Sequence, residues 1–165
     1  PGEGDEMRQP PRPPGEPIFN RLMIERVVVS ALVMGTLGFL AFRHLLLSGV
    51  SESDARNSLL LLMVLFENVH IGNCRSETRS AFALSPLRNS LLLAGTIGAQ
   101  ALHIAAMHTP GLSTILGARP VSIQHWVNLL GVALCILVAM ELHKLFHYVL
   151  RGRKKPRPDA IRRRS

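Results

Sequence analysis

The sequence predicts an all-α membrane protein with four transmembrane helices and both termini in the cytoplasm. Hydrophobic residues make up 47% of the 165-residue chain and charged residues only 18%, below the roughly 25% that is typical of soluble domains. The polar residues also gather at the two ends and in a few short breaks. This leaves apolar segments long enough to cross a hydrocarbon core.

Residues 1–21 predict a polar cytoplasmic loop, because the segment contains six prolines and a proline interrupts helical hydrogen bonding. The PPRPP sequence also fits a polyproline ligand, but a stiff loop leading into a membrane helix is the simpler interpretation. The segment does not have the pattern of a signal peptide. Because the chain opens with Pro1 rather than Met, we expect it to be a fragment or a processed form.

Residues 22–150 predict the membrane domain. A span needs about 20 helical residues, and four apolar segments are long enough, at approximately 22–47, 54–73, 89–108 and 126–149. The third segment carries small residues at a spacing that favours close packing of helices. Proline and glycine punctuate the stretch TPGLSTILGARPVSIQH before the fourth segment, which predicts a loop there.

The distribution of basic residues predicts the orientation. Residues 151–165 form a basic tail that we expect to be disordered and cytoplasmic. Four spans place this tail, the N-terminal loop and the link after the second span on one side, and that side carries every Lys and Arg except Arg43, Arg56 and Arg119. The positive-inside rule makes this side cytoplasmic. No aromatic residues for base stacking interleave with the tail's charges, so we expect membrane lipid and not nucleic acid as its partner.

Glu67 is the main candidate functional residue, because it follows the apolar run SLLLLMVLF. Ionisable side chains within spans usually face a protein interior or a water path, and Asn68 and His70 are possible neighbours of this carboxylate. The residues alone leave two interpretations open. Glu67 is either a cation ligand or an interfacial carboxylate that extends to the cytoplasm or stays protonated.

The four spans hold too few oxygen ligands for a complete site for Ca²⁺, which takes six to eight. His143 and His147 have the spacing of a metal-ligand pair, but a favourable interaction of cationic side chains with a helix C-terminus is the simpler interpretation. We also expect Glu141 to pair with Lys144. No catalytic or phosphate-binding motif is recognisable, so we expect no catalytic residue and no bound cofactor in this chain.

Three stretches together resemble a known family. FENVHIGNCRSETRSAFALSPLRNSLLL is similar to the junction between the eighth and ninth membrane helices of P-type cation-transporting ATPases of the calcium-pump type. EMRQPPRPPGEPIFNRLMIER resembles the cytoplasmic loop after their sixth helix. TILGARPVSIQHWVNLLGVALCILVAMELHKLF resembles their last loop and tenth helix.

The resemblance implies that this chain forms helices seven to ten of such a pump. Glu67 falls on the position of an eighth-helix glutamate that helps to bind one of two Ca²⁺ ions, and the other ligands come from helices four to six. The chain departs from the family's pattern at His70–Asn73, where calcium pumps tend to have Asn-Ala-Leu-Asn after the acid. The phosphorylation and nucleotide-binding domains precede this region, so ATP and Mg²⁺ belong to the full-length parent and this chain alone should not hydrolyse ATP.

We therefore expect the C-terminal transmembrane part of an ATP-driven cation pump, with Ca²⁺ as the transported ion and Glu67 as one carboxylate ligand. Its partners would be membrane lipid and the remaining helices and cytoplasmic domains of the pump, in the plasma membrane of a bacterium. The alternative is a free-standing four-helix membrane protein that binds or regulates a partner.

Overall fold

The computed structural model describes residue 15 and residues 21–74 and 89–153, with side chains to residue 149. Within these ranges the regular secondary structure is all helix, joined by short turns and connecting segments, and there is no strand. The five helices, in order, are α1 (Arg21–Leu47), α2 (Glu52–Asn73), α3 (Ser90–His108), α4 (Pro110–Leu116) and α5 (Ile123–Arg153). Most of the predicted proline-rich loop, the polar link after α2 and residues 154–165 lie outside the described residues. The predicted disordered tail begins three residues too early, because residues 151–153 continue α5.

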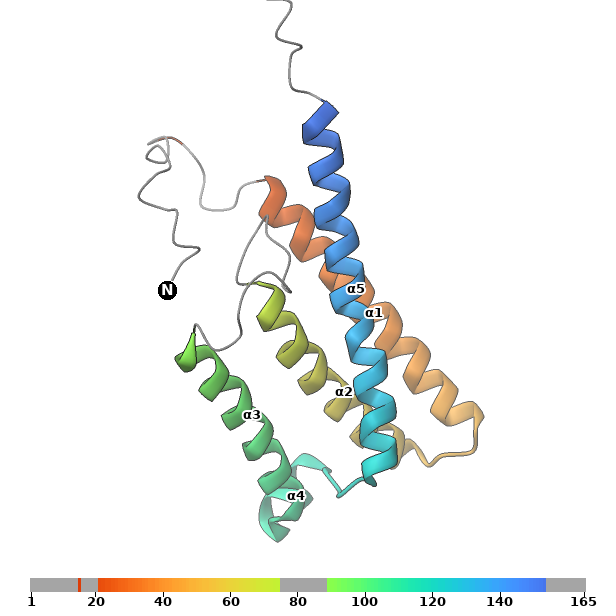
Figure 1. Cartoon of the computed structure of the whole chain (residues 1–165). Helices are drawn as coiled ribbons and strands as arrows, with labels where there is room; N and C mark the ends of the chain where they lie inside the picture. The colour runs from red at the N-terminus through yellow and green to blue at the C-terminus, as the bar shows by residue number, and fades with distance from the viewer. Residues whose placement is uncertain (1–14, 16–20, 75–88, 154–165) are drawn as a thin grey trace, which may run out of the picture.

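The helices form a bundle in which α1, α2 and α5 run side by side (Figure 1). In Figure 1, α3 lies beside α2 on the side away from α1, and the short α4 connects it to the segment before α5. The start of α1 and the ends of α2 and α5 lie at the same end of the bundle. We call this the 21/153 end, after the first residue of α1 and the last residue of α5.

The connection between α1 and α2 is built from local hydrogen bonds. Gly49 adopts a positive φ of 82°, and the amides of Gly49 and Val50 bond to the carbonyls of Leu46 and Leu45. This is the Schellman pattern that glycine favours at the end of a helix. The side chain of Ser51 then caps α2 by accepting a hydrogen bond from the Asp54 amide.

The stretch between α3 and α5 contains a helix, so the prediction of a loop at residues 109–125 was wrong in part. Pro110 occupies the first turn of α4, where its missing N–H costs nothing. Gly117 ends the helix in the left-handed conformation, with φ of 62°. The proline and glycine therefore mark the two ends of a short helix instead of excluding one.

The core of the bundle is the contact between α2 and α5. Its buried side chains recur at helical spacing on both helices: Leu61, Leu62, Leu65 and Phe66 from α2, and Leu129, Ala133, Ile136 and Met140 from α5. Side chains of α1, among them Val33 and Leu37, pack against this cluster. The middle helix α2 is thus the one whose apolar residues are best covered.

A polar contact fixes the other end of α2. Asn57 is buried; its side-chain amide donates to the Arg119 carbonyl at 2.8 Å, and its carbonyl oxygen accepts from the Arg119 amide at 3.0 Å. Nearby, Ser58 Oγ lies 2.9 Å from His125 Nε2. These contacts join the start of α2 to the segment that leads into α5.

Three helices are long and apolar enough to cross a membrane by length and composition, namely α1, α3 and residues 123–149 of α5. The predicted span at 54–73 corresponds to α2, which is not among them. α2 carries the acidic residues Glu52, Asp54 and Glu67 as well as several uncharged polar residues. An all-helical fold with three apolar candidate spans is therefore confirmed, whereas the fourth span and the orientation stay predictions.

Close packing of α1 on α2 at Gly38 leads to a first prediction. A Cβ atom at Gly38 would lie 2.7 Å from Met63 Cε and 3.4 Å from Leu59 Cδ1. We expect Gly38→Leu to lower stability by about 1–3 kcal/mol, the usual cost of overpacking, measured as a lower melting temperature in detergent. Gly35→Leu is the matched control, because nothing lies within 4 Å of a Cβ there; equal losses in both variants would contradict this packing.

A second prediction concerns Asn57. We expect Asn57→Ala to cost about 1–3 kcal/mol, because it leaves the Arg119 amide and carbonyl without their partner. The same melting experiment measures it, with Asn128→Ala as the control, since Asn128 is exposed and bonds only within α5 to Gln124. A melting temperature unchanged by Asn57→Ala would show that the contact does not hold the segment.

Candidate functional site

Glu67 lies on the outward face of α2. It is exposed, although the preceding Phe66 is completely buried in the core. Residues at helical spacing on the same face are apolar and turned outward as well, with Leu60 37% and Ile71 42% exposed. The carboxylate therefore stands in an apolar stripe that the described part of the chain leaves open.

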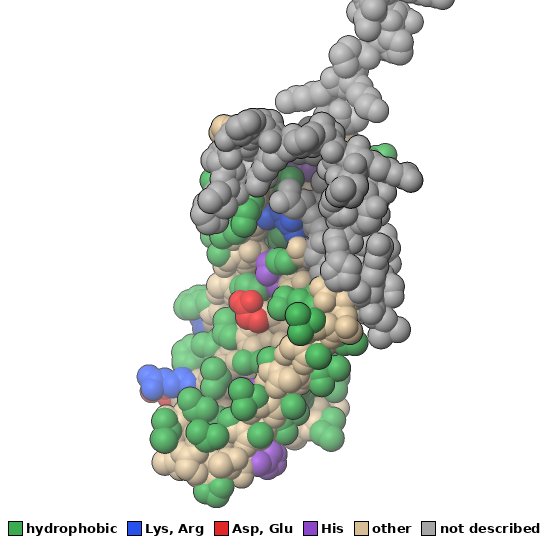
Figure 2. Space-filling view, turned by 90° about the vertical axis from the view of Figure 1, so that its left-hand side faces the viewer, with side chains coloured by type: hydrophobic (Ala, Val, Ile, Leu, Met, Phe, Trp, Pro, Cys, Tyr) green, Lys and Arg blue, Asp and Glu red, His purple; other side chains and the backbone are tan. Residues whose placement is uncertain are grey.

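The side of the bundle shown in Figure 2 has the same character. An acidic patch there stands among hydrophobic side chains, and basic and histidine side chains lie both toward the 21/153 end and near the opposite end. The acidic patch is therefore surrounded by hydrophobic side chains and does not lie at the edge of the apolar surface.

Asn68 and His70, the predicted neighbours of Glu67, are each half-buried and turn to different parts of the bundle. Asn68 Nδ2 donates to Gln100 Oε1 of α3 at 2.9 Å, which makes it a link between two helices. His70 lines a cavity of about 170 Å³ together with Arg26, Ser30 and other residues of α1, α2 and α5. The structure thus does not gather the three residues around one point.

Glu67 is not part of a complete metal site within the described residues. Among these, the group of three His, Cys, Asp or Glu side chains close enough to share an ion consists of Glu25, His143 and His147. The carboxylate of Glu67 supplies at most two of the six to eight oxygens that Ca²⁺ needs. Any Ca²⁺ site at Glu67 therefore takes most of its ligands from elsewhere.

A buried polar network lies at the 21/153 end, close to the end of α2. Asn73 is 1% exposed; its backbone carbonyl accepts from Arg26 Nη2 at 3.2 Å, and its side-chain oxygen accepts from Lys144 Nζ. Lys144 also pairs with Glu141 at 3.1 Å, which confirms the predicted i,i+3 pair. The network ties α1, α2 and α5 together through three side chains that are all buried or nearly so.

The sequence patterns missed the long-range members of these clusters. Nothing in the local sequence marks Arg26 or Lys144 as a partner of Asn73. The pair His143 and His147 was recognisable by its spacing, but its carboxylate partner Glu25 comes from α1, more than a hundred residues earlier. Cys74 and Cys135 are both free.

Comparison with known proteins identifies the chain's relatives. Residues 1–146 match the family described as "Cation transporting ATPase, C-terminus". Over 98% of its length the chain is 30% identical to calcium-transporting ATPase type 2C member 2 of Mus musculus. It is 28% identical over 88% of its length to the probable cation-transporting ATPase F of Mycobacterium tuberculosis, and 27% identical over 79% to the calcium-transporting ATPase of Bacillus subtilis.

The chain spans only a small part of these relatives, 17% of the mouse protein, 16% of the mycobacterial one and 15% of the Bacillus one. The family match nevertheless covers almost all of the chain, and it agrees with the resemblance carried by the sequence on both sides of Glu67. The chain belongs to the family of C-terminal regions of P-type cation-transporting ATPases.

Proposed function

We propose that this chain is the C-terminal transmembrane part of an ATP-driven Ca²⁺ pump, in which Glu67 contributes one carboxylate ligand to the transported ion. The observation that carries the proposal is the position of Glu67. It is an exposed carboxylate on an otherwise apolar and open face of a helix whose opposite face is fully packed. The relatives named calcium-transporting ATPases supply the choice of ion.

A physical argument connects that open face to the rest of a pump. A charged side chain facing lipid costs about 2.5–3.5 kcal/mol at the centre of a bilayer even on the lower scales. The cost is avoided if other helices cover the stripe around Glu67 and line a hydrated path there. Those helices would also supply the oxygen ligands that this chain lacks, which is consistent with its small share of the length of its relatives.

We also propose that α2 is the fourth span. Its 22 residues reach about 33 Å, enough for a hydrocarbon core of about 30 Å. Most of its buried polar residues, such as Asn57 and Asn73, bond to other parts of the bundle instead of facing lipid. Four spans place the 21/153 end and both termini in the cytoplasm, because that side carries most of the basic residues.

In this proposal ATP and Mg²⁺ act in the cytoplasmic domains of the longer protein and not in this chain. The helices described here hold the ion path and respond to those domains through the N-terminal loop. The location that we propose is the plasma membrane of a bacterium, and two of the relatives come from bacteria.

The test is ATP-driven uptake of ⁴⁵Ca²⁺ into membrane vesicles that contain the longest polypeptide encoded by the gene. We expect Glu67→Gln to weaken the apparent Ca²⁺ affinity by about tenfold or more, because the amide removes a charged oxygen ligand while keeping the side-chain shape. The control is Glu52→Gln. Glu52 is also an exposed carboxylate on α2, but it pairs with Arg56 at the opposite end of the helix.

Two results would contradict the proposal in different ways. Uptake with the same Ca²⁺ dependence in wild type and Glu67→Gln would remove Glu67 from the ion site. Absence of ATP-driven Ca²⁺ uptake in the wild-type protein, with the protein present and folded, would reject Ca²⁺ as the transported ion. If the longest polypeptide neither binds ATP nor transports a cation, a free-standing four-helix protein becomes the better interpretation.

A further inference from the structure

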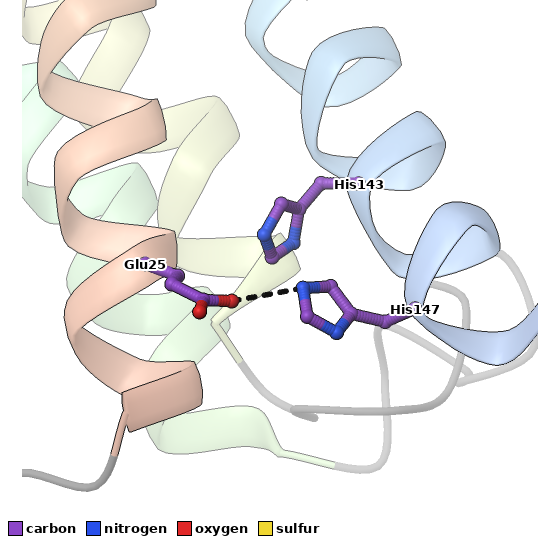
Figure 3. A group of neighbouring side chains, drawn as sticks. All are labelled: Glu25, His143 and His147. Atoms are coloured by element: carbon purple, nitrogen blue, oxygen red, sulfur yellow. Dashed lines mark ion pairs between the residues drawn. The ribbon is translucent and has the colours of Figure 1, made fainter. Parts of the chain in front are cut away.

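The 21/153 end of the bundle brings together three potential metal ligands from two helices. Glu25 lies in the second turn of α1, and His143 and His147 lie one turn apart near the end of α5 (Figure 3). One donor atom from each of them falls within 4.8 Å of the other two. Figure 3 shows the carboxylate and both rings turned toward one another in the space between the helices.

The distances between the donor groups are near the distances between ligand atoms around a bound metal ion. His147 Nε2 lies 3.0 Å from Glu25 Oε2, and the centres of the two imidazole rings are 4.6 Å apart. The ligands of a tetrahedral Zn²⁺, with bonds of about 2.0–2.1 Å, lie about 3.3 Å from one another. The remaining difference, at most about 1.5 Å against that spacing, concerns His143, whose donor atom lies within 4.8 Å of the other two.

The surroundings hold the three groups in place and leave them reachable. Glu25 Oε1 accepts a hydrogen bond from Arg21 Nε at 2.8 Å, which orients the carboxylate and leaves Oε2 for an ion, as outer partners of ligating carboxylates do. The buried Arg26–Asn73–Lys144 network fixes α1 against α5 beside the site. The side chains of Glu25 and His147 are 33% and 27% exposed, so an ion and a water ligand have access.

His143 provides a second, independent indication. Its Nδ1 atom is buried and has no hydrogen-bond partner among the residues that the structure describes. It is one of six such atoms in the described residues, and a buried polar atom without a partner calls for an explanation. An imidazole that turns toward a metal ion shared with His147 and Glu25 gives one.

We propose that Glu25, His143 and His147 bind a Zn²⁺ ion, with water as the fourth ligand, and thereby cross-link α1 to α5. Two imidazoles and one carboxylate suit borderline transition ions, whereas Ca²⁺ and Mg²⁺ prefer an all-oxygen set. The site uses none of the residues Glu67, Asn68 and His70. The zinc site therefore goes beyond the proposed transport function, and each of the two proposals can be tested without the other.

The experiment measures Zn²⁺ binding by the longest polypeptide encoded by the gene, purified in detergent, stripped with a chelator and kept in saturating Mg²⁺ and Ca²⁺. Equilibrium dialysis with metal analysis gives the stoichiometry and affinity, and Co²⁺ in place of Zn²⁺ reports tetrahedral nitrogen and oxygen ligands by its visible absorption. The variants are His143→Ala, His147→Ala and Glu25→Gln. The control is His108→Ala, an exposed histidine at the end of α3.

At micromolar free Zn²⁺ we expect the wild type and His108→Ala each to bind one more Zn²⁺ ion per chain than the His147→Ala variant binds. Glu25→Gln nearly preserves the shape of the side chain, so this variant should fold like the wild type. It should weaken Zn²⁺ binding by about tenfold or more. Zn²⁺ should also raise the melting temperature of the wild type but not of the histidine variants. Equal Zn²⁺ binding by wild type and all three site variants would overturn the proposal and reduce the cluster to an ion pair between Glu25 and His147.

Discussion

The packing of α2 between α1 and α5 is the constraint on which the rest of this structure depends. In lipid the hydrophobic effect does not drive helices together, because lipid tails are as apolar as leucine side chains. Association must come from close van der Waals contact and from satisfied polar groups. α2 provides both: its buried leucines and Phe66 fit against α5, Gly38 of α1 admits Met63, and Asn57 and Asn73 bond to neighbouring segments near its two ends.

This arrangement explains how a helix rich in polar residues packs against the apolar candidate spans α1 and α5. The polar groups of α2 are divided by position, with the amides near the ends bonded to protein and Glu67 left on the open face. The same division makes α2 the least hydrophobic of the long helices and removes it from the set of spans recognised by composition. A polar helix of this kind is stable only if other helices cover most of its sides. Here α1, α3 and α5 contact α2, and the face that carries Glu67 stays open.

The sequence was sufficient for local features and insufficient for distant ones. Long apolar segments and their polar breaks predicted the four long helices, and the position of Glu67 in its run marked it as unusual. Pro110 and Gly117 predicted a loop, because proline and glycine interrupt helices. The same two residue types also begin and end helices, which is their role in α4. Arg26, Asn73 and Glu25 acquire their importance only from contacts with other helices. No local periodicity encodes which distant turn of helix a side chain will meet.

The unequal attachment of the helices also has a consequence for how the sequence can change over time. α3 touches α2 at few points, one of them the bond between Asn68 and Gln100, and exposes apolar residues such as Leu91 and Leu102 around much of its circumference. Most of its positions are constrained only to remain apolar, so mutation can exchange one aliphatic residue for another with little penalty. Substitutions in α2 meet partners on three helices at once. Evolutionary drift should therefore accumulate in α3 and be slow in α2, where a tolerated change often requires a second, compensating one.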